Sequence, residues 1–148
     1  MISKYISEKE AFGSATAQRL GIENTPSPIA LQNMKEVANI LFDRIREWYG
    51  KPLRVGSFYR SEKLNKAIGG AKNSQHVLGE AIDFDAGTPS ENKKIFDWFI
   101  KSGLPFDQVI WEFGGDWIHI SYTTERTNRM EVLEAEKVNG KTAYKKIK

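Results

Sequence analysis

The sequence predicts an α+β fold in which a small antiparallel sheet packs against helices. Helical and strand-like segments are mixed without the strict alternation of an α/β protein, and a Gly-Gly pair joins two short apolar runs. The 148 residues are 40% hydrophobic and 28% charged, a composition typical of one globular domain. We therefore expect a single domain over residues 1–125 and a charged C-terminal tail over residues 126–148.

The first third of the chain is predicted to be helical. Ser7 and Glu10 have the spacing of a capping box, so a helix is expected from there to about residue 20. Ser27 followed by Pro28 is a typical helix start. Apolar residues then recur at helical spacing as far as Trp48, which predicts the longest helix, ending near residue 50.

The rest of the chain reads as short strands and short helices. Ser61 is expected to cap one helix, and Ser90 another that ends before Gly103. Gly114-Gly115 indicates a tight hairpin between the last two strands. Beyond Thr123 the chain is charged and weakly periodic, so a loosely attached tail is expected. The expected strands cover residues 53–58, 80–85, 108–113 and 117–122.

Charge and composition narrow the classes of function. A net charge of +3 is too small to indicate nucleic acid; it suits an anionic surface such as a bacterial wall, and solubility alone explains it equally well. The absence of cysteine excludes disulfides, thiolate zinc ligands and a cysteine nucleophile. We expect no signal peptide and no membrane span, because no long apolar stretch occurs. We also expect a monomer.

The two histidines of the chain, His76 and His119, are its most informative residues. Asp83 follows His76 by seven residues, with Gly79 between them to allow a tight turn. Zinc accepts His and Asp ligands together, and three protein ligands leave one position for water, as in catalytic sites. The alternative is that these residues bind no metal: His76 would be a surface histidine, Asp83 a solvated carboxylate and His119 a packed strand residue.

The pattern around these residues resembles a known family. His-x-x-Gly-x-Ala-x-Asp over residues 76–83, followed by Trp-x-His over 117–119, is similar to the zinc D-alanyl-D-alanine carboxypeptidases and phage endolysin peptidases that cut cell-wall peptides. The resemblance also covers residues 56–61, 64–65 and 69–70, and runs from about residue 22 to residue 122. It implies a sheet that carries one Zn²⁺ ion held by His76, Asp83 and His119.

A metallopeptidase also needs a general base, and two carboxylates compete for this role. Asp116 stands three residues before His119, the spacing at which the resembled family often places an acid. If Gly114-Gly115 forms a two-residue turn, however, Glu112 pairs with Trp117 and shares the sheet face of His119. Asp116 then points to the other face. Glu112 is slightly favoured and Asp116 remains the alternative.

The resemblance also suggests residues that contact the substrate. Arg60 is similar to an arginine that clamps the substrate carbonyl or carboxylate, where it also stabilises the developing oxyanion; the alternative is a surface arginine. Ser74 has a counterpart two residues before the first zinc histidine of relatives. Tyr59, Gln75 and Trp117 are further candidates for substrate contacts, although aromatic residues in strands more often belong to the core.

These observations predict a zinc peptidase acting on peptidoglycan stem or cross-link peptides, either as a carboxypeptidase or as an endopeptidase. We expect synthesis in the cytoplasm and action on the wall after phage- or holin-type release. Two other functions remain open: a non-catalytic wall-binding module, and a zinc amidase with a substrate unrelated to the wall. The sequence does not choose among the D-Ala-D-Ala, L-Ala-D-Glu and cross-bridge bonds.

Overall fold

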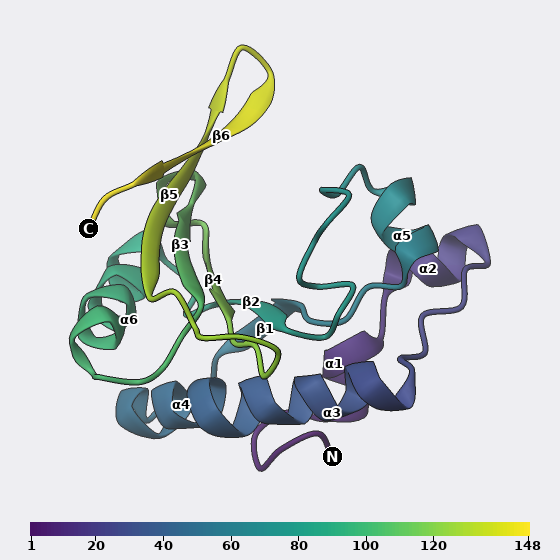
Figure 1. The fold of residues 1–148 in the computed structure, drawn as a ribbon, viewed down its shortest axis with the longest axis horizontal. Helices are drawn as coiled ribbons and strands as arrows, with labels where there is room; N and C mark the ends of the chain where they lie inside the picture. Colours follow the sequence, from purple (N-terminus) through teal and green to yellow (C-terminus); the bar gives the residue numbers. More distant parts are fainter.

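The computed structural model describes residues 1–148 and confirms the α+β fold. One six-stranded sheet has the strand order β1-β2-β4-β3-β5-β6, and every neighbouring pair is antiparallel except β3 and β5. Figure 1 shows β3, β4 and β5 side by side, with the β5–β6 hairpin projecting from the body. The strands are β1 (Arg54–Ser57), β2 (Ala81–Asp85), β3 (Gln108–Glu112), β4 (Trp117–Ser121), β5 (Glu131–Val138) and β6 (Lys141–Lys146).

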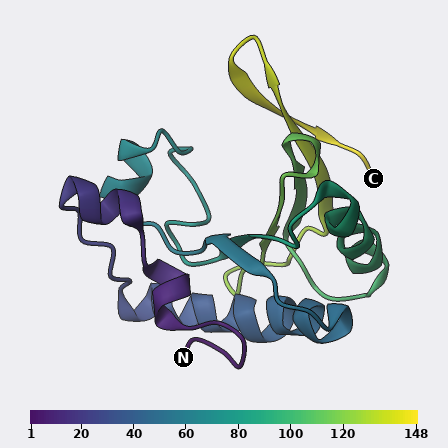
Figure 2. The ribbon, with the colours of Figure 1, turned by 180° about the vertical axis from the view of Figure 1, so that it is seen from behind.

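The longest helix is the one predicted after Ser27, whose side chain caps it with Pro28 in the first turn. It runs unbroken through α3, a π-helical segment η1 and α4, and it lies across the body at the end opposite the projecting hairpin (Figures 1 and 2). None of the helices is both long enough and apolar enough to cross a lipid bilayer. The helical segments are α1 (Glu8–Phe12), α2 (Ala15–Leu20), α3 (Pro28–Val37), η1 (Ala38–Phe42), α4 (Asp43–Tyr49), α5 (Glu62–Ala67), α6 (Pro89–Lys101) and the 3-10 turn η2 (Phe113–Gly115).

Strand alternation gives the sheet two different faces. Ile118 and Ile120 of β4 are buried in the main core, as their alternation predicted, and His119 between them lies on the opposite face. Each such buried aliphatic or aromatic side chain contributes roughly 1.5–3 kcal/mol to folding. The core joins the sheet to the long helix and to α6, and its members include Met34, Leu41, Ile45, Ile82, Phe84, Phe99 and Val109. Because the main core covers the other face, the face that carries His119 is left open for a binding site.

Two predictions about the helices were wrong. Ser7 and Glu10 form the expected capping box, but the helix stops at Gly13, whose backbone is extended, and Ser14 caps a separate helix α2. Gly13 is a weak helix former and Ser14 is a good N-cap. The predicted single helix is therefore divided into two short ones. The cap of α6 is Thr88, not Ser90, with Pro89 in the first turn.

The prediction of a loose tail was also wrong for residues 131–146. β5 pairs in parallel with β3, and β6 folds back on β5. Asn139 and Gly140, with φ of 52° and 77°, form the turn, which is the backbone conformation that an Asn-Gly hairpin requires. Val132 belongs to the main core, and Leu133 and Ala135 are buried on the opposite side of β5. These apolar positions attach the hairpin to the sheet.

Gly79 allows the segment before β2 to lie directly on α3. Its φ is +75°, and an added Cβ would meet the Ala30 carbonyl oxygen at 2.4 Å and Met34 Cγ at 2.9 Å. We expect Gly79→Ala to lower the free energy of unfolding by about 3 kcal/mol or more, since the backbone strain and the overlap add. Chemical denaturation measures this loss.

Gly103→Ala is the matched control, because Gly103 has a φ of +81° with nothing within 4 Å of an added Cβ. It should cost only the backbone strain, about 1–2 kcal/mol. Equal losses in the two variants would contradict the close packing of Gly79 on α3.

Candidate metal centre

The three predicted metal ligands lie together on the free face of the sheet. Asp83 of β2 and His119 of β4 are direct cross-strand partners, and the loop before β2 brings His76 beside them. His76 Nε2 is 3.3 Å and His119 Nδ1 is 3.0 Å from Asp83 Oδ1. One possible ligand atom from each residue lies within 4.8 Å of the others, so the group can hold a metal ion.

A backbone contact fixes the orientation of His76. Its Nδ1 donates to the carbonyl oxygen of Phe58 at 2.8 Å, and Phe58 is itself buried just beyond β1. Because Nδ1 is bound to this carbonyl, Nε2 is the ring nitrogen that faces Asp83 and can bind a metal. Metal-binding histidines commonly have such a second hydrogen bond, which sets the tautomer and the ring orientation.

The electrostatics of the group also suit a cation. Burial alone raises the pKa of Asp83, but the charges and hydrogen bonds of His76 and His119 overcome this effect and hold the pKa well below its usual range. Asp83 therefore remains a carboxylate. Two imidazole nitrogens and one carboxylate oxygen form a donor set that zinc accepts. The residues present fit a zinc ion.

The group lies in a cleft of about 600 Å³ between the loop over residues 69–76 and the sheet. The register of the strands explains which side chains reach it. Asp83, His119, Ile110 and Leu133 are successive cross-strand partners, and Trp117, Glu112, Ala135 and Tyr144 form the next row. Ile110, Leu133 and Ala135 form a small buried cluster of their own on this face. The cleft therefore has an apolar floor, which includes Ile110 and Leu133, beside the polar side chains that can hold a metal.

Glu112 lies in the cleft and Asp116 does not. Glu112 pairs with Trp117 as predicted, although the connection is the 3-10 turn η2 and not the predicted two-residue turn. Phe113 and Asp116 belong to this connection instead of pairing across it, and Asp116 is exposed, with its amide donating to the Glu112 carbonyl oxygen at 3.0 Å. Burial raises the pKa of the Glu112 side chain to about 7, and the charge of Asp83 acts in the same direction.

The sequence of residues 4–121 matches the profile of the family described as peptidase M15. This range covers most of the chain and includes the whole metal group. The chain belongs to the peptidase M15 family. The match confirms the resemblance to zinc D-alanyl-D-alanine carboxypeptidases and makes this protein a metallopeptidase. No curated protein is significantly similar to it in sequence.

Two buried donors of this M15 peptidase have no hydrogen-bond partner, and both belong to residues of the cleft. They are Arg60 Nε and Trp117 Nε1. Trp117 lies beside the Glu112 carboxyl group, whose ionised form it stabilises. Burial lowers the pKa of Arg60, while Asp83 and Glu112 oppose this change. An unpaired buried donor costs free energy, and a ligand that supplied an acceptor to Arg60 Nε would remove that cost.

The other predicted substrate contacts have different surroundings. Ser74 and Gln75 line the cleft, but Ser74 Oγ accepts from the His76 amide at 3.2 Å, and Gln75 Nε2 donates to Asp107 at 3.0 Å. Both therefore also support the His76 loop. Tyr59 lines a separate hollow beside α1 and is not brought into the cleft. Tyr59 also packs against the main core, whereas Arg60 lines both the hollow and the cleft.

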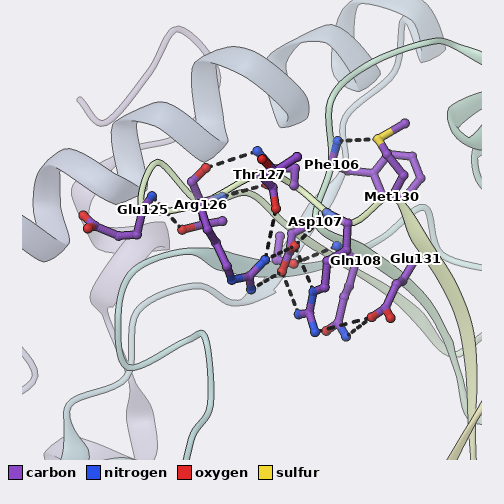
Figure 3. Close-up of polar contacts among 12 residues, drawn as sticks. Phe106, Asp107, Gln108, Glu125, Arg126, Thr127, Met130 and Glu131 are labelled. Atoms are coloured by element: carbon purple, nitrogen blue, oxygen red, sulfur yellow. Dashed lines mark hydrogen bonds and ion pairs between the residues drawn. The ribbon is translucent and has the colours of Figure 1, made fainter.

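Asp107 holds the region behind the His76 loop together and was missed in the sequence. Its carboxylate is fully buried and accepts hydrogen bonds from Arg126 at 2.7 and 2.9 Å and from Arg129 at 2.8 and 3.1 Å. It also accepts from the Arg129 amide and from Gln75. Figure 3 shows the labelled Arg126 reaching Asp107 from the segment after β4. No local sequence pattern marks this aspartate, because its partners come from distant segments.

We expect Asp107→Asn to lower the free energy of unfolding by about 2 kcal/mol at neutral pH, as its charge-assisted bonds are lost and the half-exposed arginines recover hydration. Although burial opposes it, bonding to the arginines holds the pKa of Asp107 below its usual range. The stabilisation is therefore complete above the ordinary carboxyl pKa of about 4 and is lost as the pH falls below it.

Thermal unfolding of both proteins between pH 2 and pH 7 measures this difference, which should be constant above about pH 5 and narrow steadily below about pH 4. The half-exposed Asp97, paired with Lys93, supplies the control Asp97→Asn, which should change stability little. An Asp107→Asn protein as stable as the parent at pH 7 would contradict this role.

Proposed function

We propose that this M15 peptidase hydrolyses peptidoglycan stem or cross-link peptides that contain D-amino acids. The observation that supports the proposal best is the group of buried His76 and His119 with the partly buried Asp83, in a cleft that also holds Glu112. The metal residues leave room on the cleft side, as a catalytic site requires. We further propose that the protein acts as a monomer on the wall after phage- or holin-type release.

The protein side chains have separate tasks in this proposal. Zinc bound by His76, Asp83 and His119 would supply Lewis-acid activation of the water and of the scissile carbonyl. Glu112 accepts a proton from the attacking water as the new C–O bond forms. It returns this proton to the leaving nitrogen as the C–N bond breaks. Burial raises the pKa of Glu112 above that of an ordinary carboxyl group, which favours a group that both accepts and returns a proton.

Arg60 is the proposed clamp for the substrate. Its guanidinium group lines the cleft, and its Nε has no protein partner. A positive, planar donor in this position can bind a peptide carbonyl or a carboxylate and oppose the negative charge that develops on the oxygen. Trp117 also lines the cleft, beside the Glu112 carboxyl group, while Ser74 and Gln75 keep the His76 loop in place.

A pair of synthetic peptides tests the proposal. One is a stem pentapeptide that ends in D-Ala-D-Ala, and the other is its all-L counterpart. Hydrolysis of the first and resistance of the second, followed by chromatography, is the expected result. Hydrolysis of unrelated amides without action on wall peptides would favour the zinc amidase, and binding without cleavage would favour the wall-binding module.

A further inference from the structure

The C-terminal hairpin forms one wall of the cleft, although it lies beyond the residues that match the family profile. β5 contributes Leu133 and Lys137 to the cleft, and β6 contributes Thr142 and Tyr144. Figure 1 shows the hairpin projecting beyond the end of β3. A cleft wall that is not part of the shared family sequence is a place where this protein can differ in substrate preference.

The strand register places Tyr144 over the floor of the cleft in the row of Glu112. Glu112 pairs with Ala135, and Ala135 pairs with Tyr144, so the three lie in line on one face. Ala135 is small and fully buried, while Tyr144 is about half exposed and lines the cleft. Partial burial and the carboxylates of Glu112 and Asp83 raise the pKa of Tyr144. Its hydroxyl group therefore stays protonated and able to donate.

Lys137 brings a positive charge to the same wall without a carboxylate partner. Two other lysines of the hairpin form ion pairs, Lys145 with Glu134 and Lys146 with Glu131. Lys137 Nζ instead donates to Thr142 Oγ1 at 3.3 Å and lies 5.7 Å from the centre of the Phe113 ring. These contacts hold the ammonium group at the cleft and leave its charge uncompensated.

We propose that this hairpin, residues 131–146, is a substrate-recognition wall in which Lys137 binds a free carboxylate of the wall peptide and the Tyr144 hydroxyl donates to a peptide carbonyl beside the scissile bond. Lys137 lies two residues beyond Ala135, roughly 7 Å along the strand. The row of Asp83 and His119 continues to Leu133, on the side of Ala135 away from Lys137, so the recognised carboxylate lies beyond the scissile bond in the direction of the hairpin turn. The inference rests on the proposed function.

The test uses two wall stem peptides that differ only in one group, a free D-glutamate carboxylate or its amide. Lys137→Met should raise KM for the acidic peptide about tenfold and leave KM for the amidated peptide unchanged, because one ionic contact is lost. Tyr144→Phe should lower kcat/KM about tenfold on both peptides. Lys141→Met is the matched control, since Lys141 belongs to the same hairpin but does not line the cleft.

Binding provides a second measurement that does not depend on turnover. Calorimetry with the acidic peptide and the Glu112→Gln protein should show weaker binding, about tenfold, once Lys137→Met is added. Parent-like behaviour of both hairpin variants, or an equal effect of Lys137→Met on the two peptides, would overturn the inference. If the parent cleaves neither peptide, the proposed function fails, and the role of the hairpin fails with it.

Discussion

His119→Ala is expected to abolish both stoichiometric zinc binding and the hydrolysis of wall peptides. His119 is buried in β4, and its Nδ1 lies 3.0 Å from Asp83 Oδ1, so alanine removes one of three ligands from a preformed group. Two remaining ligands hold zinc far more weakly, and activity should fall to the uncatalysed background. His76→Ala and Asp83→Ala should behave alike. Metal analysis after dialysis and peptide hydrolysis rates measure the two losses.

Asp85→Asn is the matched control for this experiment. Asp85 follows Asp83 by two residues in β2 and shares its side of the strand, but its Oδ1 accepts from the Gly87 amide at 2.9 Å and it does not line the cleft. It should keep zinc and activity. A His119→Ala protein that retains full activity would remove the basis for the metal site.

Glu112→Gln is expected to keep zinc and to lower kcat by about 10²–10⁴-fold, the usual loss when a general base is removed. Glutamine preserves the shape of the side chain but cannot accept the proton. In the parent, activity should fall as the pH drops, because Glu112 must be deprotonated to act as a base. The pKa of about 7 refers to the site without metal, and a zinc ion nearby would lower it.

Asp116→Asn is the control, since Asp116 is exposed and lies outside the cleft. It should retain both zinc and turnover, and the acidic limb of its pH profile should match that of the parent. The opposite pattern, with Glu112→Gln active and Asp116→Asn inactive, would transfer the role of base to Asp116.

The part of the fold that local chemistry encodes could be predicted from the sequence. Caps such as Ser27 and Ser61 and the alternation around His119 are set by nearby residues, and the structure has them as expected. The pairing of Glu112 with Trp117 followed from the same reasoning, because a short connection fixes the register of adjacent strands. The grouping of His76 with Asp83 and His119 depended on the resemblance, since no local rule joins them.

The remaining features depend on contacts between distant segments. The parallel pairing of β5 with β3 brings Tyr144 into the cleft across a long separation in sequence, and charged residues along β5 concealed its apolar positions. Asn139-Gly140 was the one local signal of this hairpin, since such a pair favours a tight turn. In the sequence, Asp107 looks like an ordinary surface acid, because its partners Arg126 and Arg129 come close to it only in the folded chain.

Mass spectrometry of intact peptidoglycan incubated with the purified protein tests the central claim most directly. Samples without chelator, with chelator, and with chelator followed by excess zinc should be compared. New peptide fragments that vanish with chelator and return with zinc are the predicted result, and their masses identify the bond that is cut. The absence of new fragments from several wall types, with zinc bound, would contradict the account.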